Sequence, residues 1–366
     1  MSATKGIGII GTGNIFGQYF DTIAKLDWAD LLAVADADQA RAEAVGQERG
    51  VPATSIDGLL ADPAIDLVIN LTPPAAHVEV DRRIIAAGKH VQSEKPLALS
   101  LEEGKALLAE AGQAGVQVGC APDTFLGTGL QTTIKTIQDG RIGTPFAAAA
   151  LWGGPGPEPW HPNPQFFYLP GGGPILDMGP YYVTALVAHL GPVKSVLARN
   201  LASDRQRVVG SGPLKGTPLK VETPTYAAAI LEHYSGALST VTLSFETWAS
   251  GNQLLEIYGT AGTLQLPDPN WFSLKGRIFE AEGPGEWVEL EDAAGFVDSG
   301  RGIGAVELLR AVDVGRTPRT SGLLALHVAE ILFAINTAQP GDGPIAMTTK
   351  PEVPAVVPLG ADVATV

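Results

Sequence analysis

Cysteine and charged residues are scarce in this chain of 366 residues. Its one cysteine, Cys120, excludes an intramolecular disulfide and a zinc site built from several thiolates. Charged residues make up 17% of the chain and hydrophobic residues 45%, a balance typical of a globular protein rather than a disordered one. No uncharged apolar run reaches about 18 residues, so we expect no transmembrane helix. The length suggests two domains.

Basic residues are also few, because 24 Lys and Arg stand against 39 Asp and Glu, a formal net charge of −15. Such an acidic surface argues against nucleic acid and anionic membranes as partners. The first residues, 1–5, lead directly into a strand-like segment and lack the layout of a signal peptide. We therefore expect a cytoplasmic enzyme. No cluster of His, Asp and Glu has ligand spacing, so we expect no metal.

Residues 1–122 alternate short apolar segments with helical patterns, which predicts a parallel sheet built from βαβ units. The expected strands are 6–10, 31–36, 66–72, 90–93 and 116–120, and the expected helices are 14–26, 39–49, 75–87 and 101–114. Residues 123–366 instead bring strand candidates close together, which favours an antiparallel sheet. These candidates are 145–152, 193–199, 226–234, 237–246, 253–259 and 262–265, with helices at 130–139, 177–190, 302–314 and 322–334. We predict an α/β protein with a doubly wound parallel sheet in domain 1–122 and an open, mostly antiparallel sheet in the α+β domain 123–366.

A glycine-rich turn at 11–17 joins the first expected strand to the first expected helix. Gly11 permits a tight turn and Gly13 lets the backbone approach a pyrophosphate, while the helix N-terminus offers free N–H groups. The third glycine comes one residue later than in the commonest spacing, and an ordinary glycine turn is the alternative. The residues that we assign to a dinucleotide here are Gly11, Thr12, Gly13, Asn14 and Ile15.

Asp36 ends the second expected strand, nineteen residues after Gly17. A carboxylate at this position can accept both ribose hydroxyls of an adenosine and would repel a 2′-phosphate. No Arg or Lys follows before Arg41. The sequence therefore predicts NAD rather than NADP as the cofactor, with a solvated acid at a strand end as the alternative interpretation.

Lys95 follows the fourth expected strand in the segment Glu94-Lys95-Pro96. At the carboxyl edge of a parallel sheet it would project into the crevice where ligands bind, and it could help to move the proton of a sugar hydroxyl. Glu94 would orient Lys95 or hold the nicotinamide ribose. A surface salt pair is the alternative.

The segment 72–77 ends the preceding expected strand, where a cofactor would cross the sheet edge. By itself His77 is more often a residue at a helix start than a catalyst. The residues of this segment that we assign to the cofactor are Thr72, Pro73 and His77.

Residues 153–173 form a long segment rich in Gly and Pro and interleaved with aromatic side chains. A loop of this length inside a compact domain is usually functional or disordered. Its aromatic rings could cover the apolar faces of a sugar, and a hydrophobic minicore under the loop is the alternative. The residues in and beside this loop that we assign to the substrate are Trp152, Trp160, His161 and Tyr168.

Together these segments resemble the glucose–fructose oxidoreductase, inositol dehydrogenase and rhizopine-catabolism family, abbreviated Gfo/Idh/MocA. Its N-terminal signature is matched by residues 72–77, 88–91 and 94–96, and its C-terminal site signature by residues 171–181. The resemblance implies an N-terminal Rossmann domain that binds NAD. It also implies that Lys95, Asp177 and Tyr181 surround the reactive carbon as catalytic and substrate-binding residues.

This sequence departs from the family pattern at two places. Tyr181 stands where many members have His, and it can still donate or accept a proton, but less readily near neutral pH unless Lys95 lowers its pKa. The region 120–125 lacks the arginine that many members carry. Here we assign Asp123, which could hydrogen-bond a sugar hydroxyl, and Phe125 to the substrate.

The spacing of Asp177 and Tyr181, i and i+4 on one expected helix, places both side chains on one face. A helix N-cap is the alternative role for Asp177. The function that we predict is an NAD-dependent oxidoreductase acting on a ring hydroxyl of a sugar, sugar derivative or cyclic polyol. The alternatives are an NAD-dependent glycoside hydrolase that works by transient oxidation, elimination, hydration and re-reduction, and a non-catalytic sensor. The family resemblance suggests a homodimer or homotetramer that associates through the antiparallel sheet.

Overall fold

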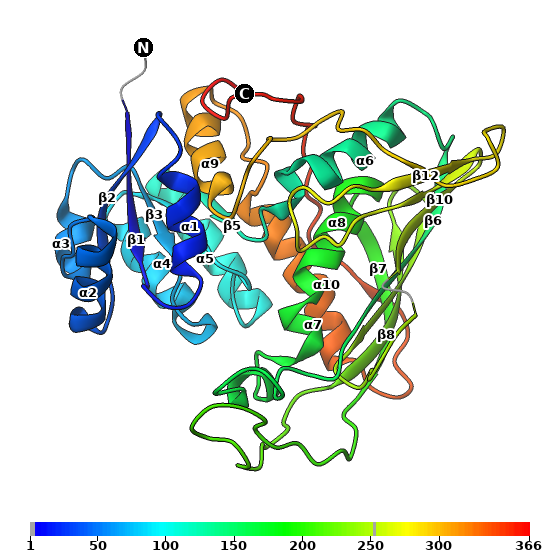
Figure 1. The fold of residues 1–366 in the computed structure, drawn as a ribbon, viewed down its shortest axis with the longest axis horizontal. Coiled ribbons are helices and arrows are strands. Elements are labelled where there is room, and N and C mark those ends of the chain that lie inside the picture. The colour runs from blue at the N-terminus through cyan, green and yellow to red at the C-terminus, as the bar shows by residue number, and fades with distance from the viewer. Residues whose placement is uncertain (1–3, 252–253) are drawn as a thin grey trace.

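The computed structural model describes residues 4–251 and 254–366 (Figure 1). Within these ranges the N-terminal sheet has five strands in the order β2-β1-β3-β4-β5, all parallel. The strands are β1 (Lys5–Ile10), β2 (Ala29–Ala35), β3 (Leu67–Asn70), β4 (His90–Ser93) and β5 (Val118–Cys120). Each strand is short and predominantly apolar because helices cover both faces of a parallel sheet. The predicted Rossmann-type sheet is confirmed.

Helices connect these strands as the sequence pattern predicts. They are α1 (Phe16–Ile23), α2 (Gln39–Arg49), α3 (Ile56–Ala61), η1 (Pro74–Ala76), α4 (His77–Ala86) and α5 (Leu101–Ala114). Helix α5 is capped at its N-terminus, since Ser100 Oγ accepts from Glu103 N at 3.2 Å. The short helix α3 was not expected.

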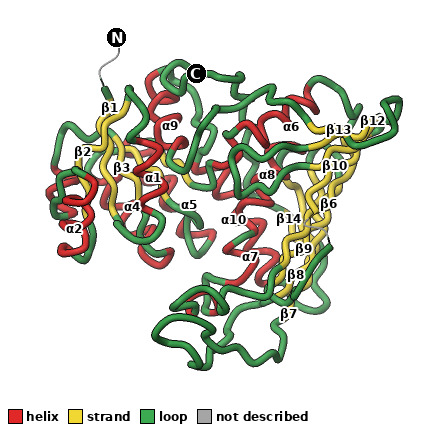
Figure 2. The backbone as a smooth tube through the Cα atoms, in the orientation of Figure 1, coloured by secondary structure: helices red, strands yellow, loops and turns green. Residues whose placement is uncertain are grey.

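The C-terminal sheet has nine strands in the described residues, in the order β13-β12-β11-β10-β6-β9-β8-β7-β14 (Figure 2). Its members are β6 (Pro145–Gly153), β7 (Val193–Leu201), β8 (Tyr226–His233), β9 (Leu238–Ser244), β10 (Leu254–Gly259), β11 (Gly262–Gln265), β12 (Arg277–Glu280), β13 (Val288–Glu289) and β14 (Ile345–Ala346). All neighbouring pairs are antiparallel except β6 and β9. The predicted mostly antiparallel sheet is confirmed. The expected strand 253–259 begins at Leu254, and Gln253 lies outside the described residues.

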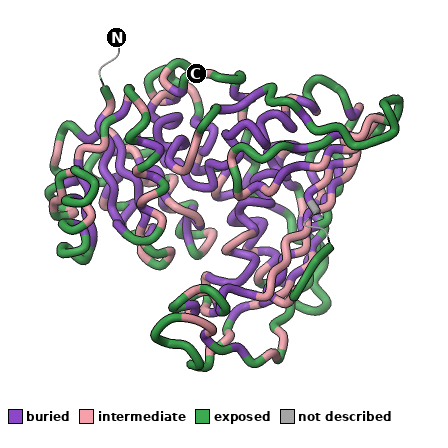
Figure 3. Tube along the Cα trace, viewed as in Figure 1, coloured by how far each residue is buried: buried purple, intermediate pink, exposed green. Residues whose placement is uncertain are grey.

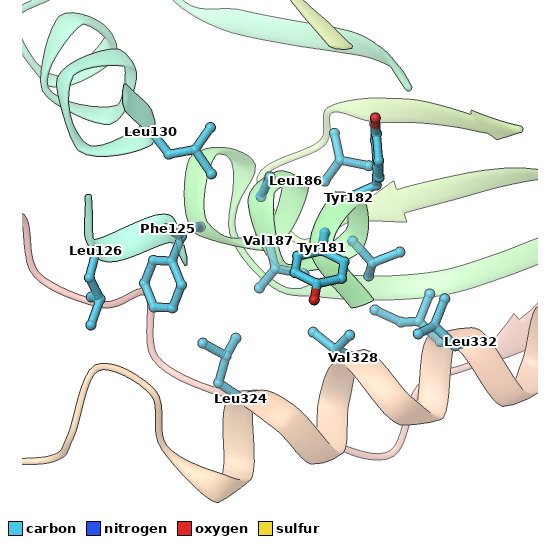
Figure 4. Close-up of a cluster of buried hydrophobic side chains, with 14 of the residues drawn as sticks. Phe125, Leu126, Leu130, Tyr181, Tyr182, Leu186, Val187, Leu324, Val328 and Leu332 are labelled. Atoms are coloured by element: carbon cyan, nitrogen blue, oxygen red, sulfur yellow. The ribbon is translucent and has the colours of Figure 1, made fainter. Parts of the chain in front are cut away.

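One face of this sheet is covered by helices, and the opposite face is more exposed (Figure 3). The helices of the C-terminal part are α6 (Thr128–Gln138), η2 (Thr124–Leu126), η3 (Gln165–Tyr168), α7 (Gly173–Asp177), α8 (Gly179–Leu190), α9 (Ile303–Asp313) and α10 (Gly322–Thr337). Every residue of α8 is buried, because the helix lies between the sheet and α10. Figure 4 shows Leu324, Val328 and Leu332 of α10 pointing toward α8.

The expected single helix 177–190 is wrong at its start. The chain forms α7 up to Asp177, interrupts at Met178 and starts α8 at Gly179. Pro180 explains the break, because it has no N–H to donate to the carbonyl of Leu176 and its ring crowds that carbonyl. Asp177 therefore ends one helix, and Tyr181 lies in the first turn of the next.

Helices from beyond residue 122 also pack on the parallel sheet. Helix α9 contacts α1, β3, β4 and β5, and α10 contacts α5 and β5. The two parts of the chain thus share a hydrophobic core, and the domain division at 122 stays a prediction. None of the helices in the described ranges is long and apolar enough to span a bilayer.

Candidate active site

The glycine turn lies where the order of the parallel strands reverses, because β1 pairs with both β2 and β3. Gly11 has φ +103°, and a Cβ there would lie 2.7 Å from the backbone of Leu71, so only glycine fits. A Cβ on Gly13 would meet no atom within 4 Å. The N-terminus of α1 therefore faces open space, which suits the approach of a pyrophosphate.

Asp36 ends the β2 segment and is bound from several sides. Its Oδ2 accepts from Thr12 N at 2.7 Å, and its Oδ1 accepts from Asp38 N at 2.9 Å. Arg41 donates to both oxygens, with its closest nitrogen 2.6 Å from Oδ1. Burial alone would raise the pKa of Asp36, but these hydrogen bonds outweigh it and lower the pKa to about 2.

The contact with Arg41 corrects one step of the sequence argument for NAD. The argument took Arg41 to lie too far along the chain to matter, whereas α2 turns its guanidinium back onto Asp36. The Arg41 side chain remains 51% exposed. A cation is therefore available beside the carboxylate that we assign to the adenosine ribose.

Thr72 and His77 brace the turn that follows β3. Thr72 Oγ1 donates to Asn70 Oδ1 at 2.6 Å. The buried ring of His77 lies between two carbonyl oxygens, with Nε2 2.7 Å from Thr72 O and Nδ1 2.8 Å from Pro96 O. Burial lowers the pKa of His77, so the neutral ring donates to one of the two. His77 thus joins two loops of the sheet edge from the inside, while Pro73 is exposed.

Lys95 and Asp177 form the central ion pair of the site. Lys95 Nζ lies 2.9 Å from Asp177 Oδ1 and 2.8 Å from the carbonyl oxygen of the same residue. Burial alone would lower the pKa of Lys95, but the charge of Asp177 outweighs it and raises that pKa. The same nitrogen lies 5.4 Å from the ring centroid of Tyr181. The three residues are therefore brought together, although the helix that was expected to align two of them is broken.

Tyr181 is 7% exposed and lies beside two cations, Lys95 and Arg301. Burial raises the pKa of Tyr181, and the two positive charges offset this only in part. Lys95 therefore acts in the direction that would favour proton transfer by Tyr181, but burial outweighs it. Both Tyr181 and Lys95 hold their protons at neutral pH.

Glu94 contacts the hydroxyl of Tyr19 and the backbone nitrogen of Lys95. Its Oε1 accepts from the hydroxyl of Tyr19 at 2.6 Å, and its Oε2 accepts from Lys95 N at 3.0 Å. Sequence reasoning did not single out Tyr19 or Arg301. Arg301 lies between Gly300 and Gly302, and a cation between two glycines is a local signal that could have marked it.

Asp123 and Phe125 need a correction, because both are 1% exposed and lie inside the protein. Asp123 Oδ2 accepts from the backbone nitrogens of Gly302 and Gly304 at 2.8 and 3.0 Å, and so holds the N-terminus of α9. Phe125 belongs to the hydrophobic cluster around α8 (Figure 4). These positions give Phe125 and the Oδ2 of Asp123 structural contacts, while Asp123 Oδ1 is buried without a hydrogen-bond partner in the described residues.

The segment 153–173 divides into a buried and an exposed layer. Tyr168 is fully buried, and its hydroxyl donates to Glu158 and lies 2.8 Å from Arg207 NH1. It is therefore not the pocket residue that we expected, because its polar tip is used inside the protein. Trp152 is partly buried and packs edge-on against Phe245 at 5.8 Å.

The exposed layer is an aromatic cluster made of Trp160, His161, Phe166 and Phe167. His161 lies at its centre, with ring centroids 5.4 to 5.5 Å from the other three. Trp160 is 66% exposed and Phe166 is 51% exposed. Tyr168 therefore fits the alternative of a hydrophobic minicore, whereas Trp160 and Phe166 leave much of their ring surface exposed, where a ligand could bind.

Cys120 lies inside the protein, next to the backbone of Glu94. The thiol of Cys120 is buried and lies 3.5 Å from the carbonyl oxygen of Glu94. Burial raises its pKa, so it stays protonated and is a poor nucleophile. In the part of the chain that the structure describes, no group of three or more His, Cys, Asp or Glu is placed to hold a metal ion.

Two family models match the chain over most of its length. Residues 5–121 match the model described as "Oxidoreductase family, NAD-binding Rossmann fold". Residues 130–265 match the GFO/IDH/MocA C-terminal domain. The resemblance seen in the sequence motifs is confirmed over both halves of the fold.

Similar proteins include enzymes that are named for sugars. The 1,5-anhydro-D-fructose reductase of Ensifer adhaerens is 27% identical over 296 residues, which cover 79% of this chain and 80% of that protein. The D-xylose 1-dehydrogenase (NADP(+)) 2 of Haloferax volcanii is 26% identical over 346 residues, covering 90% and 95%. The crystal structure of an aldose-aldose oxidoreductase from Caulobacter crescentus complexed with glycerol has a TM-score of 0.79 at 20% identity and covers 94% of this chain and 100% of that one. That likeness shows a shared fold.

Proposed function

The chain belongs to the Gfo/Idh/MocA family of oxidoreductases, and on that premise we propose that it transfers a hydride between NAD(H) and a ring hydroxyl of a sugar, sugar derivative or cyclic polyol. The observation that carries the proposal is the convergence of Lys95, Asp177 and Tyr181 at the carboxyl edge of the parallel sheet. A substrate oxygen placed among them meets two proton donors and one carboxylate. This is the set that interconversion of an alcohol and a ketone needs.

The residues of the sheet edge fit a dinucleotide. The open N-terminus of α1 at Gly13 would hold the pyrophosphate, and Asp36 would bind the adenosine ribose. We assign Thr72, Pro73 and Glu94 to the remaining part of the dinucleotide, where it would cross the edge of the sheet. When bound, the nicotinamide supplies the hydride acceptor or donor.

Proton transfer falls to Tyr181, and Lys95 stabilises negative charge on the substrate oxygen. Lys95 is paired with a carboxylate, which holds its proton firmly. Tyr181 carries a phenol proton at neutral pH and has no carboxylate on its hydroxyl in the described residues. In reduction Tyr181 donates this proton to the carbonyl oxygen, and in oxidation it accepts one after it has ionised. The rate of oxidation should therefore rise with pH in the alkaline range.

The aromatic cluster supports a sugar or polyol as substrate, because ring faces suit the apolar side of a pyranose. Trp160 and His161 follow the β6 strand and precede α7, which ends at Asp177. The relatives named above are a reductase and a dehydrogenase. They lend no support to the glycoside hydrolase alternative.

A substrate screen tests the proposal. Sugars, polyols and glycosides are each incubated with NAD and with NADP, while absorbance at the nicotinamide band and product identity are recorded. Accumulation of NADH with an oxidised sugar or polyol supports the proposal. Release of an aglycone without net redox change contradicts it in favour of transient oxidation, and the absence of turnover with every compound contradicts it outright.

We also propose that the chain forms a homodimer or homotetramer through the outer face of the antiparallel sheet. One row across this face contains Leu197, Ile230 and Thr240, which pair in register on β7, β8 and β9. Leu197 is 37% and Ile230 46% exposed, which leaves apolar area for a partner to cover. A monomer in light scattering at micromolar concentration would contradict this assembly.

A further inference from the structure

Arg301 lies where three separate parts of the molecule meet. It precedes α9, and its guanidinium carbon lies 5.5 Å from the ring centroid of Tyr181. Its Nε donates to Gln18 Oε1 at 3.0 Å, and its NH2 donates to Asn270 Oδ1 at 2.7 Å. Gln18 belongs to α1, whose N-terminus faces the predicted pyrophosphate site. One side chain thus touches the cofactor helix, the loop after β11 and the proposed proton-transfer residue.

The backbone around Arg301 is fixed by the glycines on either side of it. A Cβ on Gly300 would lie 2.5 Å from Thr22 Oγ1, and a Cβ on Gly302 would lie 3.1 Å from the Tyr19 ring. Gly302 also has φ +100°, a conformation that side chains rarely adopt. Only glycines allow the segment to press this closely on α1. Packing therefore fixes the backbone of Arg301, and the side-chain amides of Gln18 and Asn270 hold its guanidinium.

The charge of Arg301 has no carboxylate within ion-pair distance in the described residues, unlike that of Lys95. Its Nε and one terminal nitrogen donate to amide oxygens, and the carboxylates that act on its charge from beyond ion-pair distance are Glu94 and Asp123. The charged groups that act on Tyr181 are Lys95 and Arg301, which favour its ionised form, and Glu94 and Asp177, which oppose it. Because Asp177 is paired with Lys95, the cation beside the phenol that has no direct ion pair in the described residues is the guanidinium of Arg301.

We propose that Arg301 is a positioning residue for the reaction, which holds the ring of Tyr181 against the cofactor domain and stabilises the tyrosinate that forms when Tyr181 gives up its proton. The proposal rests on the proposed proton transfer by Tyr181. It assigns a role to a residue that is separated from the Lys95 and Asp177 motifs by more than a hundred positions. The proton itself still passes between the Tyr181 hydroxyl and the substrate oxygen.

The test compares Arg301→Gln, which removes the charge, with Arg301→Lys, which keeps it. An opposite charge at this range shifts a pKa by about one to three units. We therefore expect the alkaline rise of the oxidation rate to move up by about one pH unit or more in Arg301→Gln and to return most of the way in Arg301→Lys. Binding of NADH, followed by its fluorescence, should change by less than about threefold, because no cofactor contact is assigned to Arg301.

Arg277→Gln is the matched control, since Arg277 also binds a glutamine amide, that of Gln265, but lies on β12. It should leave the pH profile unchanged. A profile of Arg301→Gln that equals the wild type, or a failure of Arg301→Lys to restore the shift, would overturn the proposal, because a purely structural role predicts lower rates at an unchanged pH midpoint.

A second measurement keeps this proposal separate from the proposed function. Tyrosinate absorbance is titrated in the intact protein and in Arg301→Gln, and Tyr181→Phe versions of both identify the contribution of Tyr181. The Tyr181 midpoint should be higher without the guanidinium. If no substrate is turned over, the proposed function fails while this titration still decides the role of Arg301, and an equal midpoint in both proteins would refute it.

Discussion

The carboxyl edge of the parallel sheet, which we assign to the cofactor, and the segment 153–173, which we assign to the substrate, are held by different forces. At this edge Gly11 directly follows β1, and Lys95 is the second residue after β4. The register of the sheet therefore fixes their places. The segment has almost no regular structure, and buried charges anchor it. Arg207 lies 2.7 Å from both Glu158 and Glu246. The residues that we propose for the chemistry are thus placed by backbone pairing, whereas the segment 153–173 depends on side-chain charges.

This difference has an energetic consequence. A strand end cannot shift without breaking several hydrogen bonds of the sheet. An ion network in the interior contributes little net stability while intact, but removal of one member leaves uncompensated buried charge. The segment should therefore be the part of the site that a single substitution can loosen without disturbing the cofactor edge.

The largest expected effect is at the cofactor edge. Lys95→Ala and Tyr181→Phe should each lower turnover by about 10²–10⁴-fold, the usual range for a lost acid–base group. Binding of NAD should change little, because neither substitution alters the glycine turn. Steady-state kinetics and NADH fluorescence measure the two properties. Near-normal turnover in both variants would remove these residues from the mechanism.

The second prediction concerns the ion network of Arg207 with Glu158 and Glu246. Arg207→Met should destabilise the protein by about 3–5 kcal/mol, since Glu158 and Glu246 would lose their closest cation and keep only the more distant Arg205. Thermal or denaturant unfolding measures this. Arg141→Met removes an exposed pair with Glu280 and should cost no more than about 1 kcal/mol. Equal losses in the two variants would show that the network does not anchor the segment.

The same contrast explains what the sequence could predict. The strand ends and the residues Asp36, Lys95 and Tyr181 followed from local apolar runs and short motifs, which need no knowledge of distant contacts. The burial of Tyr168 did not follow, because its partner Arg207 is 39 residues away and only folding brings them together. The break before α8 had a local signal in Pro180.

Long-range packing also decided the residues that the sequence misassigned or missed. We expected Asp123 to hydrogen-bond a sugar, but its Oδ2 accepts from the backbone nitrogens of Gly302 and Gly304, which lie far along the chain. Arg301 acts across the two halves of the chain, so no local pattern describes its contact with Gln18. Motifs therefore indicated the residues that we propose to carry the chemistry, and the tertiary structure shows which contacts hold them.

The third prediction concerns cofactor choice. Asp36→Ala should weaken NAD binding and narrow the gap to NADP, because the carboxylate that accepts ribose hydroxyls is lost. Arg41→Ala should weaken NADP by about tenfold and NAD less, since a charge-assisted hydrogen bond contributes about 1.5–3 kcal/mol. Equilibrium binding of both cofactors measures this. Arg49→Ala, on the same helix but away from Asp36, is the control. Tighter binding of NADP than NAD by the wild type would contradict the assignment of Asp36.

The smallest expected effect is at the exposed aromatic cluster. Trp160→Ala should raise KM for the sugar by roughly three- to tenfold or change the preferred sugar, since an aromatic contact contributes about 0.5–1.5 kcal/mol. His161→Ala should act in the same direction. Because Trp160 is 66% exposed, the free energy of unfolding should change by less than about 0.5 kcal/mol. Kinetics and melting temperature are measured on the same samples, together with cofactor affinity, which should stay constant.

Tyr168→Phe supplies the opposite case within the same segment. It removes the hydroxyl that binds Glu158 and Arg207 while keeping the buried ring, so melting temperature should fall and KM should stay near normal in the folded protein. The two variants thus separate the exposed and buried layers by their readouts. A Trp160→Ala protein that loses stability and keeps its KM would show that the cluster is part of the core, and the segment would then have no role in substrate choice.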